Sequence, residues 1–198
     1  MRSFESSAGV RFAPWVRSTA LGWALGVPAI VLFAALAESL GCHTLHTPVG
    51  AGAGLAVGFF QARALRMWHG PVTRWFWSCF LGLTAPFGGA DLANLAGLGL
   101  PYSLHPSVVI GGLVVGTWQA VLLRTSFGPA AAWVAASVLG WGFASGSVAL
   151  ADLLVRSCAI GGIAGAVVYL ILIASGGFAL ALPTGLTLAR LPCTPGEV

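Results

Sequence analysis

The sequence predicts an all-α integral membrane protein, a six-helix bundle built from three parallel helical hairpins with both termini in the cytoplasm. Three observations predict this fold class. Only 7% of the 198 residues are charged and 58% are hydrophobic, which is too few charges to cover a surface that faces water. Six apolar stretches are about as long as a membrane span. A pattern of glycine, glutamine, arginine and tryptophan also recurs at a fixed spacing, as in repeat proteins.

The six predicted spans follow one another with short connections. A helix needs roughly 20 mainly apolar residues to cross the hydrocarbon core of a bilayer. The connections leave no room for a separate soluble domain, so residues 1–198 are expected to form a single transmembrane domain. The spans cover residues 18–40, 49–66, 75–97, 106–124, 131–154 and 158–182.

The first span has an alternative interpretation as a cleaved signal peptide. Arg17, an apolar run and the Ala-Leu-Ala at 35–37 follow one another in the order of such a signal. The apolar run of about twenty residues is longer than the usual signal core of roughly 7–15. We therefore expect a retained helix.

The second and fourth spans carry the same motif at an offset of 58 residues, Gly-x3-Gly-x2-Gln-x4-Arg. The glycines and the glutamine lie on one helix face. Small residues there let helices approach closely, and a glutamine in lipid needs a partner inside the bundle. We favour hydrogen bonds between helices, and the alternative is a polar ligand site. The residues are Gly54, Gly58 and Gln61 in one copy and Gly112, Gly116 and Gln119 in the other.

The first, third and fifth spans share a tryptophan followed six residues later by Leu-Gly, at Trp15, Trp75 and Trp133. Each repeat is therefore a hairpin, over residues 15–70, 71–128 and 129–190. Because each hairpin starts on the same side, the copies are parallel repeats about an axis along the membrane normal.

The sixth span is expected to be a degenerate copy of the second and fourth. Gly161 or Gly162 begins the pattern and Gly165 continues it. Val168 or Tyr169 then takes the place of the glutamine, so the third copy is expected to have lost its polar residues.

All nine basic residues are arginine, and their positions indicate the orientation. Eight of the nine lie before the first span, around the second and fourth connections or in the tail, which the positive-inside rule assigns to the cytoplasm. The net charge of +4 therefore does not indicate nucleic-acid binding. The absence of lysine excludes a lysine Schiff base and a P-loop.

Arginines and tryptophans near the cytoplasmic ends of spans are expected to contact the membrane surface. Arg66 and Arg124 follow their glutamines by five residues, where a guanidinium group reaches lipid phosphates. The alternative is that both bind an anionic ligand. Four tryptophans fit an aromatic belt at the same boundary, namely Trp15, Trp68, Trp75 and Trp77.

The polar residues on the outer side give weaker candidates. Asp91, Asn94 and Asp152 form a possible ion site, although Asp152 has Arg156 one turn away as an ordinary partner. Cys42, His43 and His46 are metal-ligand types, but their spacing matches no established zinc motif. We therefore expect no bound metal and no cofactor.

The repeated Gly-x3-Gly-x2-Gln-x4-Arg motif, with its tryptophan and Leu-Gly, resembles a group of small multi-span bacterial membrane proteins of unassigned function. The resemblance covers most of residues 15–141 and departs in the last span. It implies a location in the bacterial cytoplasmic membrane and supplies no activity. In size and span number the chain is also similar to substrate-binding subunits of vitamin transporters, a likeness that is poor evidence for function.

These observations favour a non-enzymatic membrane protein, a scaffold or accessory subunit with lipids and other membrane proteins as partners. The alternative is a small transporter or substrate-binding subunit with a polar site at Gln61 and Gln119. An intramembrane enzyme comes third, because no nucleophile or metal set lies at depth.

Overall fold

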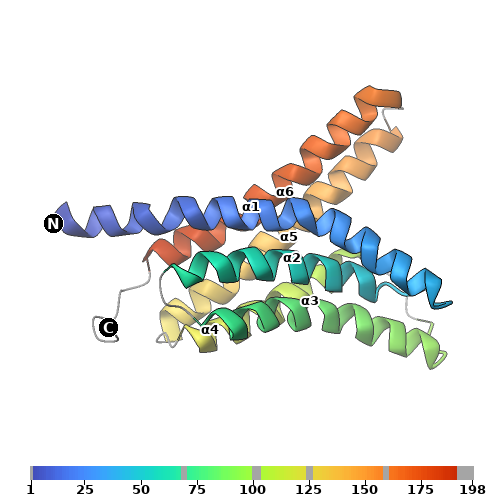
Figure 1. Ribbon diagram of the computed structural model, residues 1–198, viewed down its shortest axis with the longest axis horizontal. Coiled ribbons are helices and arrows are strands. Elements are labelled where there is room, and N and C mark those ends of the chain that lie inside the picture. The colour runs from blue at the N-terminus through green and yellow to red at the C-terminus, as the bar shows by residue number, and fades with distance from the viewer. Residues whose placement is uncertain (1, 68–70, 100–103, 124–126, 158–160, 191–198) are drawn as a thin grey trace.

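The computed structural model describes residues 2–67, 71–99, 104–123, 127–157 and 161–190. Within these ranges the chain forms six α-helices (Figure 1). Their bounds are Arg2–Ser39 for α1, Thr47–Arg66 for α2, Val72–Leu95 for α3, Leu104–Leu122 for α4, Phe127–Ser157 for α5 and Gly162–Arg190 for α6. The predicted all-α class is confirmed.

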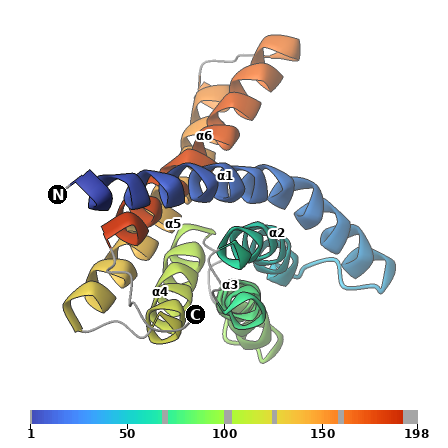
Figure 2. The ribbon, with the colours of Figure 1, turned by 60° about the vertical axis from the view of Figure 1, so that its left-hand side comes forward.

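The helices close into a ring in chain order. Each packs against its neighbours in the sequence, and α6 returns to pack against α1. Figure 2 shows α2, α3 and α4 side by side, with α1 crossing beside α2 toward α6. The far halves of α5 and α6 stay together and diverge from the other helices, which opens the ring at that end (Figures 1 and 2).

Four of the described helices are long and apolar enough to cross a membrane, namely Phe12–Ser39 within α1, α4, Gly128–Ser157 within α5, and α6. The other two are not, for different reasons. Much of α2 is Gly and Ala, and its second half carries Gln61, Arg63 and Arg66, so its mean hydropathy is too low. The helix α3 carries polar residues toward both of its ends. Six spans, the hairpin repeats and the side of the termini stay predictions.

Two helices extend beyond their predicted bounds. The helix α1 begins at Arg2, well before the predicted span, and α6 continues through Pro183 to Arg190. Pro183 removes one backbone N–H donor, a loss that a helix packed in a bundle tolerates. The extension of α6 adds a further turn, which carries Thr184.

Glycines of the Leu-Gly pairs let the two helices of each predicted hairpin approach closely. A Cβ atom built on Gly82 would lie 2.7 Å from Val115 Cγ2, closer than van der Waals contact allows. Three such contacts join α1 to α2, α3 to α4 and α5 to α6, through the pairs Gly22–Val57, Gly82–Val115 and Gly140–Leu180.

Candidate functional site

Three tryptophans meet inside the ring. Trp15, Trp75 and Trp133 come from α1, α3 and α5, and all three are completely buried. Their ring centroids lie 5.6–6.0 Å apart, and each pair has edge-to-face geometry. Aromatic pairs in this arrangement contribute about 0.5–1.5 kcal/mol each beyond the area that they bury. This cluster, the tryptophan triangle, closes one end of the space inside the ring.

The triangle corrects the expected aromatic belt. Trp15 and Trp75 lie in the protein interior instead of at a lipid boundary. Trp77 is 45% exposed, as a belt residue would be, and Trp68 lies outside the described residues.

Each indole of the triangle donates a hydrogen bond to a polar side chain of an even-numbered helix. Trp75 Nε1 donates to Gln61 Oε1 at 3.1 Å, and Trp133 Nε1 donates to Gln119 Oε1 at 3.2 Å. Trp15 Nε1 donates to Thr184 Oγ1 of α6 at 3.0 Å.

Thr184 corrects the expectation for the last helix. Neither Val168 nor Tyr169 takes the part of the glutamine, and α6 has a polar acceptor two residues beyond the predicted end of its span. The helix α6 repeats the spacing of α2 and α4, in which two small residues four positions apart are followed three positions later by a polar acceptor. In α6 these residues are Gly177, Ala181 and Thr184.

The two glutamines are also hydrogen-bonded through their amide nitrogens. Gln61 Nε2 donates to Thr19 Oγ1 at 3.2 Å, and Gln119 Nε2 donates to Cys79 Sγ at 3.1 Å. Their side chains are 4% and 2% exposed. With both ends of each amide engaged by the protein, this geometry favours the helix-contact interpretation over a ligand site.

Replacing Gln61 by leucine is therefore expected to lower stability. The change leaves the Trp75 indole N–H and the Thr19 hydroxyl without this partner in a buried place, at a cost of about 1–2 kcal/mol. Thermal unfolding of the detergent-solubilised protein measures the loss. A ligand role for Gln61 predicts instead an unchanged unfolding temperature and lost ligand binding.

The glycines of the motif face neighbouring helices rather than a cavity. A Cβ on Gly54 or Gly58 would meet Cys79 and its neighbours on α3. A Cβ on Gly112 would lie 2.9 Å from Trp141 Cβ, and one on Gly116 would lie 2.7 Å from Ser137 Cβ, both on α5. These four glycines are sites of helix contact, as their spacing indicated.

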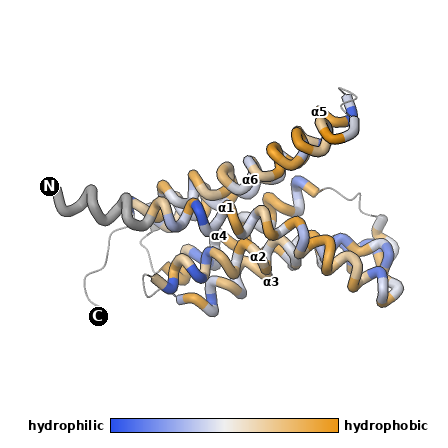
Figure 3. The backbone as a smooth tube through the Cα atoms, turned by 45° about the horizontal axis from the view of Figure 1, so that its top comes forward, coloured by the Kyte–Doolittle hydropathy of each residue, from blue (hydrophilic) through white to orange (hydrophobic). Residues whose placement is uncertain are grey.

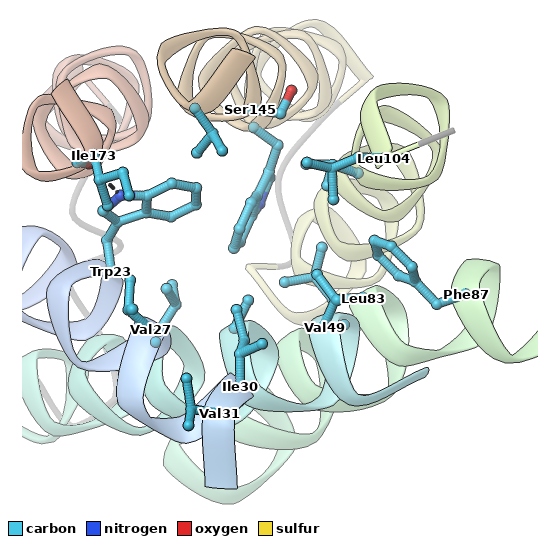
Figure 4. Close-up of a pocket in the computed structure, with 17 residues that line it drawn as sticks. Trp23, Val27, Ile30, Val31, Val49, Leu83, Phe87, Leu104, Ser145 and Ile173 are labelled. Atoms are coloured by element: carbon cyan, nitrogen blue, oxygen red, sulfur yellow. Dashed lines mark hydrogen bonds between the residues drawn. The ribbon is translucent and has the colours of Figure 1, made fainter. Parts of the chain in front are cut away.

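A cavity of about 190 Å³ lies inside the ring (Figure 4). All six described helices contribute lining residues, and the surface that they present is apolar. Trp23 and Trp141 form part of the wall, with their ring centroids 6.1 Å apart. Trp23 Nε1 donates to the backbone oxygen of Ile173 at 2.6 Å, so the indole fixes α1 to α6 beside the cavity.

The cavity was missed at the sequence level, although a signal for it was present. Trp23 and Trp141 each lie eight residues after a tryptophan of the triangle, and Leu83 holds the matching place on α3. Eight residues are about two helical turns, so these side chains lie on the same inner face. Figure 4 shows Leu83 and Trp23 with Val27, Ile30 and Val49 around the open centre.

Asp91, a sequence candidate for an ion ligand, caps the start of the neighbouring helix α2. Its carboxylate accepts bonds from His46 N at 2.8 Å, Thr47 N at 2.7 Å and Thr47 Oγ1 at 2.6 Å, at the start of α2. His46 Nδ1 lies 3.1 Å away. A carboxylate at this helix end satisfies free N–H groups and interacts favourably with the helix dipole.

The other two candidates for the ion site differ in position. Asn94 is exposed, and it lines a small pocket together with Asp91 and His46. Asp152 lies on α5 and accepts a bond from Arg156 Nε at 2.8 Å, which confirms the ordinary pairing expected for it.

Replacing Asp91 by asparagine is expected to destabilise the protein by about 2 kcal/mol. The amide removes the charge and turns N–H donors toward groups that already donate. Asp152→Asn is the matched control, because an exposed ion pair contributes only about 0.2–1 kcal/mol. Denaturant titration of both variants measures the difference, and equal effects would contradict the capping role.

The remaining sequence candidates are exposed or lie outside the described part. Cys42 and His43 are exposed, and His46 bonds Asp91. Within the described residues no group of three His, Cys, Asp or Glu side chains is arranged to hold a metal. Arg66 is exposed at the end of α2, where lipid headgroups would meet it, and Arg124 lies outside the described residues.

The cavity at the centre of the ring has room for a foreign molecule of modest size, bounded by tryptophans and aliphatic side chains. The surface of its wall is apolar, which suits an apolar molecule. Comparison with protein-family models, with curated proteins and with solved structures found no match for the chain.

Proposed function

We propose that this chain is a non-enzymatic, six-span membrane protein that binds a small apolar molecule at the centre of its helix ring. It would serve as the ligand-binding or accessory subunit of a membrane protein complex. The observation that carries the proposal is the apolar cavity to which every described helix contributes. Sites between the helices of a bundle are frequent places for ligands.

The chemistry of the cavity wall supports an apolar occupant. The lining offers water no polar surface to bind, so an apolar molecule fits it better than water does. Apolar cavities of similar size stay dry and take up benzene or xenon. A bound apolar molecule would recover contacts that the lining side chains lack.

The topology that we propose agrees with the distribution of apolar and charged residues. Figure 3 shows hydrophobic stretches along α5 and α6 and hydrophilic residues at the tip of their hairpin. Many large apolar side chains are exposed, such as Leu32, Leu153 and Leu170, and in a bilayer they would face lipid or partner helices. Arg17, Arg66 and Arg190 fit a cytoplasmic end, with both termini inside.

Filling the cavity should abolish ligand binding. Val49→Phe places a ring where Figure 4 shows the Val49 side chain pointing into the open centre. Val167→Phe is the control, because Val167 is exposed on α6 and does not line the cavity. Small molecules retained through purification are extracted and identified by mass spectrometry.

The expected result is loss of the retained molecule from Val49→Phe and its retention in Val167→Phe. The two changes are chemically identical, so a general effect of added bulk would appear in both. Retention of the same molecule by Val49→Phe would contradict a ligand site at the cavity.

A further inference from the structure

We infer that the ligand is a lipid with a zwitterionic headgroup, whose head binds a cleft between α4, α5 and α6 while one acyl chain enters the central cavity. This inference rests on the proposed function and specifies its ligand. The cleft is lined by Asp152, Arg156, His105 and Tyr169 among its polar residues. The observation that links the head site to the tail site is that the cleft and the cavity share two lining residues.

The cleft and the cavity share part of their walls. Leu104 at the start of α4 and Val148 on α5 line both. The cleft lies near the tip of the α5–α6 hairpin, where these helices diverge from the rest of the ring (Figures 1 and 2). A molecule with its head in the cleft would have to pass between Leu104 and Val148 for its chain to reach the cavity beside Trp141.

The two hollows differ in chemistry in the way that the two ends of a lipid differ. The cavity wall is apolar, with Trp23, Trp141 and aliphatic side chains. The cleft carries an exposed acid and an exposed base, with Asp152 50% and Arg156 79% accessible. His105 of α4 and Tyr169 of α6 add a ring nitrogen and a hydroxyl from two further sides.

The charges of the cleft favour a headgroup that carries both signs. Arg156 uses Nε to bond Asp152, which leaves its terminal nitrogens for an anionic phosphate. Asp152 has a second carboxylate oxygen for an ammonium group. A headgroup with only negative charge would meet Arg156 but also lie against Asp152, which opposes it.

The headgroup has to supply most of the selectivity. Lipid tails are as apolar as the cavity wall, so moving a chain from the bilayer into the cavity brings little hydrophobic gain. The cavity limits length instead. A cavity of 150 Å³ accepts benzene, so 190 Å³ has room for about seven or eight carbon atoms of one chain.

The test uses the purified full chain and single-chain lipids with identical acyl chains. Affinities are measured by native mass spectrometry for lysophosphatidylethanolamine and lysophosphatidylglycerol, and for glycerophosphoethanolamine, which has the head without the chain. We expect the ethanolamine lipid to bind about tenfold more tightly than the glycerol lipid. The chainless head should not bind measurably.

Variants assign the headgroup to its cleft. Arg156→Gln and Asp152→Asn should each weaken binding of the ethanolamine lipid about tenfold. The exchange of both residues, Asp152→Arg with Arg156→Asp, should restore part of the affinity. Arg63→Gln is the matched control, because Arg63 is exposed on α2 away from the cleft and should leave binding unchanged.

The outcomes separate this inference from the proposed function. Equal affinity for the two lipids, or binding that is indifferent to Arg156→Gln, overturns the headgroup assignment. If Val49→Phe still blocks those lipids, the cavity remains the ligand site. Binding that survives Val49→Phe overturns the cavity itself, and tight binding of the chainless head would identify the site as one for a soluble phosphoester.

Discussion

Replacing Trp75 by alanine is expected to lower the free energy of unfolding by about 3–5 kcal/mol, the largest effect of any single change considered for this chain. The indole is completely buried and packs edge-to-face against both other members of the tryptophan triangle. Its removal also leaves Gln61 Oε1 without the indole donor. The substitution therefore creates a cavity and removes the aromatic contacts and the hydrogen bond at the same time. Thermal unfolding in detergent should show a much lower midpoint.

Trp77→Ala is the matched control for this prediction. Trp77 lies two residues further along the same helix and is 45% exposed, so its removal should cost far less. Trp75→Phe gives an intermediate case, because phenylalanine keeps an aromatic ring but is smaller than tryptophan and has no N–H donor. Equal midpoints for Trp75→Ala and Trp77→Ala would contradict an interior triangle.

The sequence predicted the helices and part of the inner contacts for clear physical reasons. Long apolar runs in a chain with few charges allow little but helices, and five of the six predicted C-terminal helix ends lie within a few residues of the observed ones. Gln61 and Gln119 were expected to bond across helices because a buried amide needs partners, and both do. These inferences depend on local composition and on the cost of a buried polar group.

Which side chains contact the tryptophans depends on how the six helices close into a ring, and no local sequence pattern determines that arrangement. Trp75 and Trp15 lie near span ends, where tryptophan usually marks an interface, so position alone gave the wrong surroundings. Thr184 was missed because the predicted last span ended before it. Its role follows only from the return of α6 to α1, which brings Thr184 beside Trp15 across almost the whole chain.

The sequence marks residues on the inner face, but it does not reveal the open space among them. The existence of the central cavity depends on the divergence of α5 and α6 from the other helices, a matter of helix angles rather than of residue type (Figure 2). Val49 and Ile30 look like ordinary core residues in the sequence. Only the angles between the helices leave space among them.

Replacing Gly54 by leucine is the second change expected to have a large effect, a loss of about 3 kcal/mol or more. A Cβ at this position would lie 2.7 Å from the backbone oxygen of Cys79 and 2.9 Å from Phe80 Cα. Backbone atoms cannot rotate away as a side chain can, so α3 would have to move away from α2. That movement would also stretch the hydrogen bond from Trp75 to Gln61, which joins the same two helices.

Gly89→Leu gives this prediction a control of opposite sign. Gly89 lies inside α3, and a Cβ built there would meet nothing within 4 Å. Leucine is a better helix former than glycine by nearly 1 kcal/mol, so Gly89→Leu should keep or raise the unfolding midpoint while Gly54→Leu lowers it. If both substitutions destabilised the protein equally, the loss of stability would be a general effect of placing leucine in a helix of this chain. A difference in sign would instead assign it to the contact between α2 and α3, on which the tryptophan triangle and the floor of the cavity depend.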